Sequence, residues 1–255
     1  MRNTIRAEFI KIRTVMVHWV LTIIAVVFPI VITVLVTIFG DFGVSFDDVS
    51  TDVAGFIVAR GVVTAMLLGA MAAISITSEY AHNTIRPTFA ATSSRLRVHA
   101  SKLIVNSAVL AVVCAFAVFV CWFIAQLILS ARDVSISIGD PDVLTRLVGG
   151  VALAVLVGWF GFGLGLIIRN SPATVTILLL WPLLIENLIA LVLNLLDWDG
   201  ATKWLPYSAA IQASTAGGDD DLVDALGRPM GFVWFGVVSA ALIGLGAFLD
   251  QRRDA

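Results

Sequence analysis

Six long apolar segments constrain the fold of this chain more than any other feature. They span residues 18–40, 55–77, 103–129, 147–168, 173–196 and 231–249. A helix of about 17–25 apolar residues crosses a hydrocarbon core about 30 Å thick, and each segment is long enough for that. Charged residues make up 13% of the chain, about half the share in a soluble domain. We therefore expect an all-α integral membrane protein with six transmembrane helices, forming one domain over residues 1–255.

The charges between these segments alternate in sign, which predicts the orientation. Eleven Lys and Arg residues lie in the two termini and in the gaps after the second and fourth segments. The other gaps hold only four, together with thirteen aspartates. Because short loops rich in Lys and Arg stay in the cytoplasm, we expect both termini to be cytoplasmic. No basic block is large enough to indicate a nucleic-acid partner.

Residues 1–17 carry a pattern of their own. Ile5, Phe9, Ile12 and Met16 form a narrow apolar stripe on a helical wheel, and Arg2, Arg6 and Arg13 line one edge of it. This pattern is typical of an amphipathic helix in the cytoplasmic interface of the lipid bilayer, with its basic groups near anionic headgroups. The alternative is an ordinary positive flank that sets topology without forming a helix.

Small residues at four-residue spacing mark three helix faces. These ridges are Gly61, Ala65, Gly69 and Ala73, then Gly161 and Gly165, then Gly236, Ala240 and Gly244. Such faces let helix backbones approach closely in lipid. We expect them to pack mainly within one subunit.

Ionisable and polar groups also occur inside the apolar segments. Glu186 lies in the fifth with Asn187 beside it, and Arg60 lies in the second. A charge in hydrocarbon costs at least about 2.5–3.5 kcal/mol, so these groups should face protein or water. They are candidates for a transport pathway or a proton relay. Alternatively, Glu186 and Arg60 form a structural pair, or Glu186 is protonated and bonded to a neighbour.

The gap at residues 78–102 is the one sizeable loop expected in the cytoplasm. It mixes charged, aromatic and apolar side chains, and Pro87 disfavours helix at Arg86. Such a loop can hold a short helix that docks into a partner, or it can be a solvated connector.

Several of these pieces, in this order, resemble the permease subunits of ABC-2 type transporters. The matching strings are Glu8-Phe9-x-Lys11-x-Arg13-Thr14, Ser78-Glu79-Tyr80-x-x-x-Thr84-Ile85-Arg86, Ala91-Thr92-Ser93-Ser94-Arg95, Leu164-Gly165-x-x-x-Arg169-Asn170-Ser171 and Trp181-Pro182-Leu183-Leu184-x-Glu186. The resemblance extends almost from end to end. Pro87 departs from the pattern and could shorten the helix expected in the loop.

The resemblance implies how such a chain works. Residues 78–92 would contain a coupling helix that sits on an ATPase subunit, with Glu79, Tyr80, Thr84, Ile85 and Arg86 as its coupling residues. It also implies a dimer with a second permease, identical or paralogous, with the transport path between the subunits. A short re-entrant helical hairpin would precede the last span, within residues 197–230.

The chain itself has no phosphate-binding string of the form G-x-x-x-x-G-K-[ST]. We therefore expect no catalytic, cofactor-binding or metal-binding residues here. ATP and Mg²⁺ would be bound by two copies of a separate P-loop ATPase. The expected function is export of a hydrophobic or amphipathic substrate (a drug, a peptide or a lipid) across a bacterial-type plasma membrane. The alternatives are a secondary transporter and a regulatory membrane protein that transports nothing.

Overall fold

The computed structural model describes residues 2–39, 49–85, 94–131, 138–215 and 226–253. Within these ranges the chain is helical, and no strand occurs. The longer helices are α1 (Arg2–Thr14), α2 (Met16–Phe39), α3 (Val49–Ala81), α5 (Arg95–Ser130), α6 (Pro141–Ile168) and α10 (Arg228–Arg253). The shorter ones are α7 (Ser171–Leu180), α8 (Glu186–Leu195) and α9 (Pro206–Thr215). A π-helical turn (Trp181–Ile185) joins α7 to α8, and a 3₁₀ turn (Asp199–Trp204) precedes α9.

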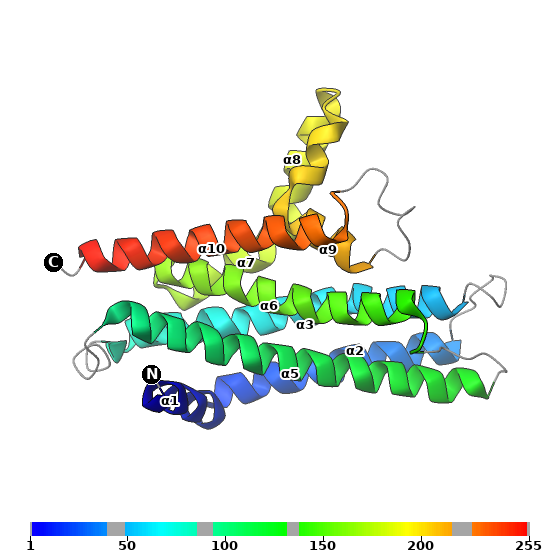
Figure 1. Ribbon diagram of the computed structural model, residues 1–255, viewed down its shortest axis with the longest axis horizontal. Helices are drawn as coiled ribbons and strands as arrows, with labels where there is room; N and C mark the ends of the chain where they lie inside the picture. Colours follow the sequence, from blue (N-terminus) through cyan, green and yellow to red (C-terminus); the bar gives the residue numbers. More distant parts are fainter. Residues whose placement is uncertain (1, 40–48, 86–93, 132–137, 216–225, 254–255) are drawn as a thin grey trace.

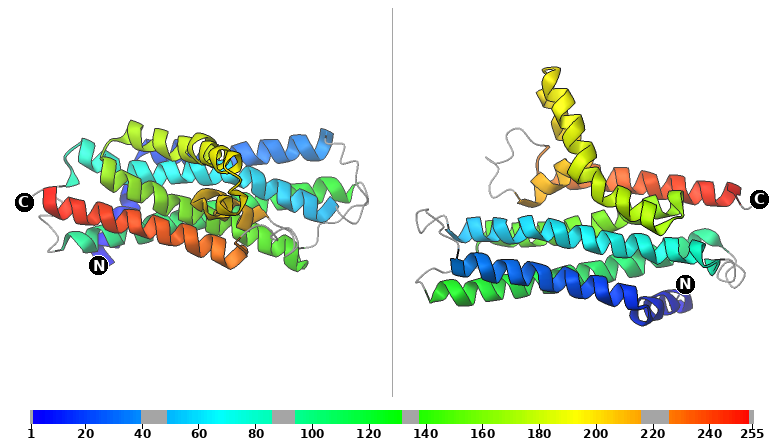
Figure 2. Two further views of the ribbon diagram at one scale, coloured as in Figure 1. Left: turned by 90° about the horizontal axis from the view of Figure 1, so that it is seen from above. Right: turned by 180° about the vertical axis from the view of Figure 1, so that it is seen from behind.

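Six of the described helical segments are long and apolar enough to cross a membrane, which confirms the number of spans expected. They are Met16–Phe39, Gly61–Ala81, Arg95–Ser130, Pro141–Ile168, Ser171–Leu195 and Arg228–Arg252. Several extend beyond the predicted bounds because polar residues at their ends are also helical. The long helices α2, α3, α5, α6 and α10 run side by side, whereas α8 leaves the bundle (Figures 1 and 2).

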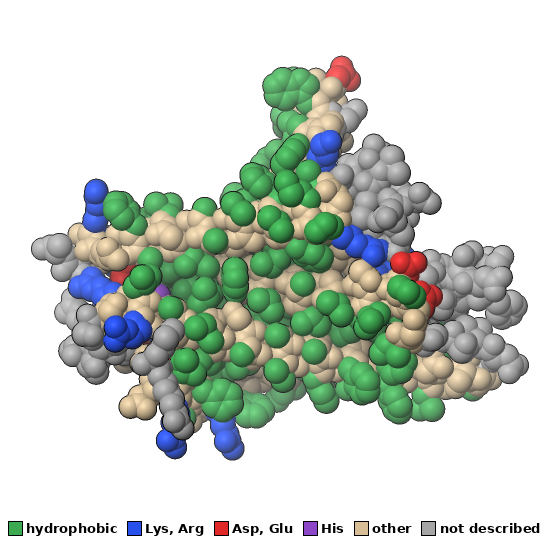
Figure 3. All heavy atoms as spheres, viewed as in Figure 1, with side chains coloured by type: hydrophobic (Ala, Val, Ile, Leu, Met, Phe, Trp, Pro, Cys, Tyr) green, Lys and Arg blue, Asp and Glu red, His purple; other side chains and the backbone are tan. Residues whose placement is uncertain are grey.

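Both chain ends lie at the same end of the bundle, which we call the terminal end; the opposite end is the distal end (Figure 1). Most of the Lys and Arg side chains in view lie at the terminal end, whereas Asp and Glu side chains are visible at the distal end and at the tip of α8, with little at the terminal end (Figure 3). This arrangement agrees with an even number of crossings. That the terminal end faces the cytoplasm stays a prediction.

Helix α1 forms over most of the segment expected to be amphipathic, and it lies across the bundle axis at the terminal end (Figures 1 and 2). Its apolar stripe is only partly covered, because 53% of Phe9 is exposed and Met16 in the following helix is 77% exposed. The helix itself is thus present. Its place in a membrane interface stays a prediction.

The most extensive helix contact among the described residues is between α3 and α6, along the first two ridges of small residues. A Cβ atom added at Gly161 would lie 2.6 Å from the Gly69 carbonyl oxygen, and one added at Gly165 would lie 3.2 Å from the Ala73 carbonyl oxygen. These two ridges therefore pack within the subunit, as expected. The third ridge is looser, since a Cβ at Gly244 would meet nothing within 4 Å.

Pro29 and Pro182 lie inside the first and fifth apolar segments and predict a kink in each, and the fifth span breaks at Pro182. Proline has no N–H to donate to the preceding turn, and the π-helical turn accommodates this gap. The Asn187 side chain then donates to the carbonyl oxygens of Pro182 and Leu183, both at 3.0 Å. In contrast, α2 continues through Pro29 as one helix.

The segment before the last span contains two short helical elements, the 3₁₀ turn Asp199–Trp204 and α9. Helix α9 packs against α6 and α10. Tyr207 of α9 is fully buried, with ring centroids 6.2 Å from Phe160 and 5.0 Å from Phe235. The rest of the implied re-entrant hairpin falls partly at 216–225, outside the described residues.

Candidate functional site

Four charged side chains from three helices meet at the terminal end, and we call them the carboxylate–lysine network. Lys102 of α5 donates to Glu8 Oε2 of α1 at 2.6 Å and to Glu79 Oε1 of α3 at 2.5 Å. Lys11 of α1 donates to Glu8 Oε1 at 3.0 Å and to the same Glu79 oxygen at 2.7 Å. The network therefore ties α1 to both α3 and α5.

The network is buried, and its charges balance. Lys102 is 1% exposed, Glu8 5% and Glu79 6%. Buried charges are tolerated when each has a partner, but removal of one partner leaves the others uncompensated. At the edge of the network, burial opposes the charge of Lys11, yet its hydrogen bonds to Glu79 and Glu8 keep its pKa above the usual value.

A polar cavity of about 350 Å³ adjoins this network. Glu8, Lys11 and Glu79 line it together with His18 and Asn106. Both ring nitrogens of His18, Asn106 Oδ1 and Glu79 Oε2 are buried without a protein partner among the described residues. The cavity is large enough for water molecules that would satisfy these atoms.

A second cluster lies beside the network and is centred on Asp250 near the end of α10. Its Oδ1 accepts from Tyr80 at 2.8 Å and from Arg169 Nη2 at 2.6 Å, and its Oδ2 lies 3.0 Å from His99 Nε2. Arg95 also donates to the Asp250 carbonyl oxygen at 3.0 Å. This Asp250 cluster joins α3, α5, α10 and the end of α6.

Of the five residues expected to couple to an ATPase, the four that the structure describes do not form one exposed surface. Glu79 is buried in the carboxylate–lysine network, Tyr80 is half-buried in the Asp250 cluster, and Ile85 is 6% exposed. Thr84 is exposed, and Arg86 lies outside the described residues. Residues 81–84 form an exposed turn, which bends at Asn83 with a φ of 55°. Glu79 therefore connects α3 to α1 and α5, and its side chain is too buried to contact a docking partner.

Glu186 lies 1% exposed at the start of α8, where it caps another helix. Its Oε1 accepts from the Tyr207 backbone N–H at 2.8 Å and from Trp181 Nε1 at 3.1 Å. Its Oε2 accepts from the Ser208 N–H at 2.7 Å and from the Ser208 hydroxyl at 2.6 Å. Both N–H groups belong to the first turn of α9, whose positive dipole end stabilises a carboxylate.

Asn187, the neighbour of Glu186, is directed to the backbone of its own helix at the π-helical turn. The side chain of Arg60 lies outside the part of the chain whose side chains are described. The pair of Glu186 with Arg60 therefore stays a prediction, although both oxygens of Glu186 already have donors.

The sequence patterns missed the partners of the two terminal-end clusters. Lys102, His99 and Asp250 lie within helices whose apolar residues dominate the signal, and their contacts come from distant parts of the chain. One signal was present, since charged residues inside the ends of apolar spans need partners. It could have marked Lys102 and Asp250 as candidates without saying which residues they meet.

Comparison with known proteins agrees with this architecture. The model of the ABC-2 family transporter proteins matches residues 4–196, which include most of α1 and the first five spans. No curated protein and no solved structure matches the chain. The match covers most of the chain and includes the carboxylate–lysine network, whereas the sixth candidate span and Asp250 lie beyond it. The chain therefore belongs to the ABC-2 family of transporter permeases.

Proposed function

We propose that this permease is the membrane half of an ATP-driven exporter in a bacterial-type plasma membrane. It pairs with a second permease, identical or paralogous, and moves a hydrophobic or amphipathic substrate outward between the two subunits. Two copies of a P-loop ATPase bind ATP and Mg²⁺ and drive the cycle. Membership of the ABC-2 family supports this division of labour, since the permease is not itself an ATPase.

The terminal end faces the cytoplasm in this proposal. The eleven-to-four distribution of Lys and Arg and the common position of both termini support that orientation. Helix α1 then lies at the cytoplasmic surface of the membrane, across the ends of the long helices. A cysteine placed at Asp220 should be labelled from outside intact cells, and one placed at Asn83 should not. Labelling at Asn83 would overturn the orientation.

The exposed turn at residues 81–84 and the following Arg86 dock on the ATPase. The observation that carries this step is the position of the turn, directly after two residues that hold the bundle together. Glu79 connects the end of α3 to α1 and α5, and Tyr80 connects it to α10. A force applied at the turn therefore reaches three other helices through short polar contacts.

Co-purification with the ATPase and transport in proteoliposomes test this proposal. Charge changes at the turn, Thr84→Glu with Arg86→Glu, should weaken the complex or abolish ATP-dependent transport while the permease still inserts. Lys203→Glu, in the 3₁₀ turn before α9, serves as the control, because it changes a charge outside the docking turn. Normal ATP-dependent transport by the doubly changed protein would reject the docking surface. Transport that runs on an ion gradient without the ATPase would favour a secondary transporter.

A further inference from the structure

Two apolar grooves lie where α1 meets the long helices, one on each side of Phe9. The first groove, of about 610 Å³, is lined by Ile5 and Phe9 of α1 and by one face of α5 that includes Ala108. The second, of about 450 Å³, is lined by Phe9 and Ile12 of α1, by the start of α2 and by α5. Phe9, Val109 and Val113 belong to both grooves. Phe9 thus separates two neighbouring grooves, and both are lined mainly by apolar side chains.

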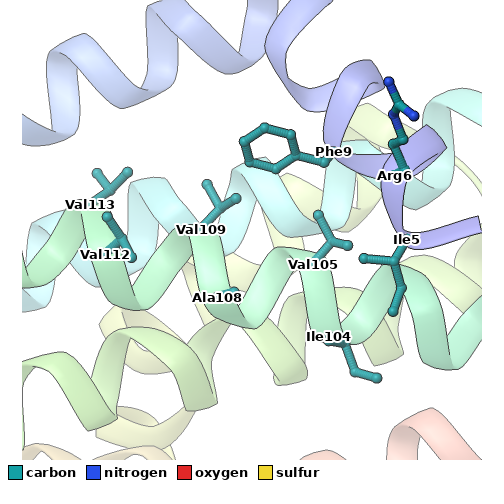
Figure 4. Close-up of a pocket in the computed structure, with 9 residues that line it drawn as sticks. All are labelled: Ile5, Arg6, Phe9, Ile104, Val105, Ala108, Val109, Val112 and Val113. Atoms are coloured by element: carbon teal, nitrogen blue, oxygen red, sulfur yellow. The ribbon is translucent and has the colours of Figure 1, made fainter. Parts of the chain in front are cut away.

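The walls of these grooves remain open although they are apolar. In Figure 4, Ile5 and Phe9 extend from α1 beside the row of α5 side chains from Ile104 to Val113. Phe9 is 53% exposed and Val112 is 69% exposed. Both volumes lie within the range of small-molecule sites. An apolar occupant is therefore required for each groove to be closed.

Each groove has a cation at its rim. Arg6 lines the first groove and Arg13 lines the second. The two are seven residues apart on α1, which places them about 10 Å apart along one helix face. Both side chains are exposed, and neither has an ion pair or side-chain hydrogen bond among the described residues. Lys11, in contrast, is engaged by the carboxylate–lysine network.

We propose that one anionic two-chain phospholipid binds here, with one acyl chain on each side of Phe9 and its phosphate held by Arg6 and Arg13. Two apolar grooves that adjoin at Phe9 match a lipid with two acyl chains. The two guanidinium groups without partners among the described residues match an anionic headgroup. The inference rests on the proposed function only in placing α1 at the cytoplasmic leaflet. The bound lipid would clamp α1 onto α5 next to the carboxylate–lysine network.

Binding to the detergent-solubilised full chain tests this site. The probes are phosphatidylglycerol and phosphatidylcholine with identical acyl chains, counted by native mass spectrometry. The unmodified chain should retain phosphatidylglycerol about tenfold more tightly than phosphatidylcholine. Arg6→Gln with Arg13→Gln should remove that preference, whereas Arg97→Gln, an exposed cation of α5 outside both grooves, should keep it.

Groove filling tests the acyl chains separately. Ala108→Phe places a ring in the first groove and should weaken binding of both lipids about tenfold, whereas Ala115→Phe, two turns farther along the same exposed face of α5, should not. Single-chain lysophosphatidylglycerol should bind more weakly than the two-chain lipid. Equal binding of the two headgroups, or unchanged binding in Ala108→Phe, would overturn the proposal. These measurements need neither ATP nor an ATPase, so their failure would leave the proposed transport function untouched.

Discussion

Buried carboxylates occur in two regions of this permease, and each region neutralises them in a different way. At the terminal end, Glu8 and Glu79 face the ammonium groups of Lys11 and Lys102. In the fifth span, Glu186 accepts two backbone N–H groups from the start of α9, an indole N–H and a hydroxyl.

The two regions differ in which structural elements their carboxylates connect. Opposite charges join three helices that come from distant parts of the sequence, so the network depends on all of its members at once. The cap on α9 uses dipoles that the helix already has, and only one charged residue is involved. We therefore expect single substitutions to cost more in the network than at the cap.

The largest effect is expected from Lys102→Met, which removes the most buried cation of the network. Glu8 and Glu79 would then share only the half-exposed Lys11, so the free energy of unfolding in detergent should fall by about 3–5 kcal/mol. Thermal and denaturant unfolding measure this loss. Lys203→Met, a lysine of the 3₁₀ turn, is the control and should change stability by less than about 0.5 kcal/mol. A loss no greater than the control would mean that the network contributes little to folding.

A smaller loss is expected from Glu186→Gln, because the amide keeps one acceptor for the N–H groups of α9. The free energy of unfolding in detergent should fall by about 1–3 kcal/mol, because the N–H and O–H donors around Glu186 lose a charged acceptor. Ser208→Ala, which removes only the hydroxyl donor, should cost less. If Glu186→Gln leaves stability unchanged but alters transport or its pH dependence, Glu186 serves the transport path instead.

Double-mutant cycles sharpen the comparison. Glu79→Gln and Lys102→Met should be strongly non-additive, because the two side chains are in direct contact. Glu186→Gln and Arg60→Gln should be additive within about 0.5 kcal/mol if the α9 cap, rather than Arg60, neutralises Glu186. If the double variant of Glu186 and Arg60 instead recovers stability, the result would support the ion pair between these two residues that the sequence suggests.

The smallest effect on stability is expected at the exposed turn after α3. Thr84→Glu should change the free energy of unfolding by no more than about 0.5 kcal/mol, since the side chain is exposed. ATPase-coupled transport should nevertheless decrease. A large loss of stability in Thr84→Glu would show that the turn, like Glu79, is part of the structural core of the terminal end.

Much of the helical framework could be predicted from local patterns. The six spans, the break at Pro182 and the helix faces that allow close packing follow from apolar length, a missing N–H and small side chains. The contacts that the candidate site residues make could not be predicted in this way. Glu79 matched a family string for coupling, yet its surroundings depend on Lys102, which is 23 residues away, and on Glu8, a further helix away.

The sequence by itself determined how many helices are long and apolar enough to cross a membrane and which gaps carry positive charge. In lipid every backbone polar group must be satisfied within the segment, so length and hydropathy suffice to define a span. Only the tertiary structure decided the partners of each buried charge. Lys102 meets Glu8 across 94 residues and Asp250 meets His99 across 151, because helix packing brings them together. Periodicity describes one helix at a time and carries no information about such contacts between helices.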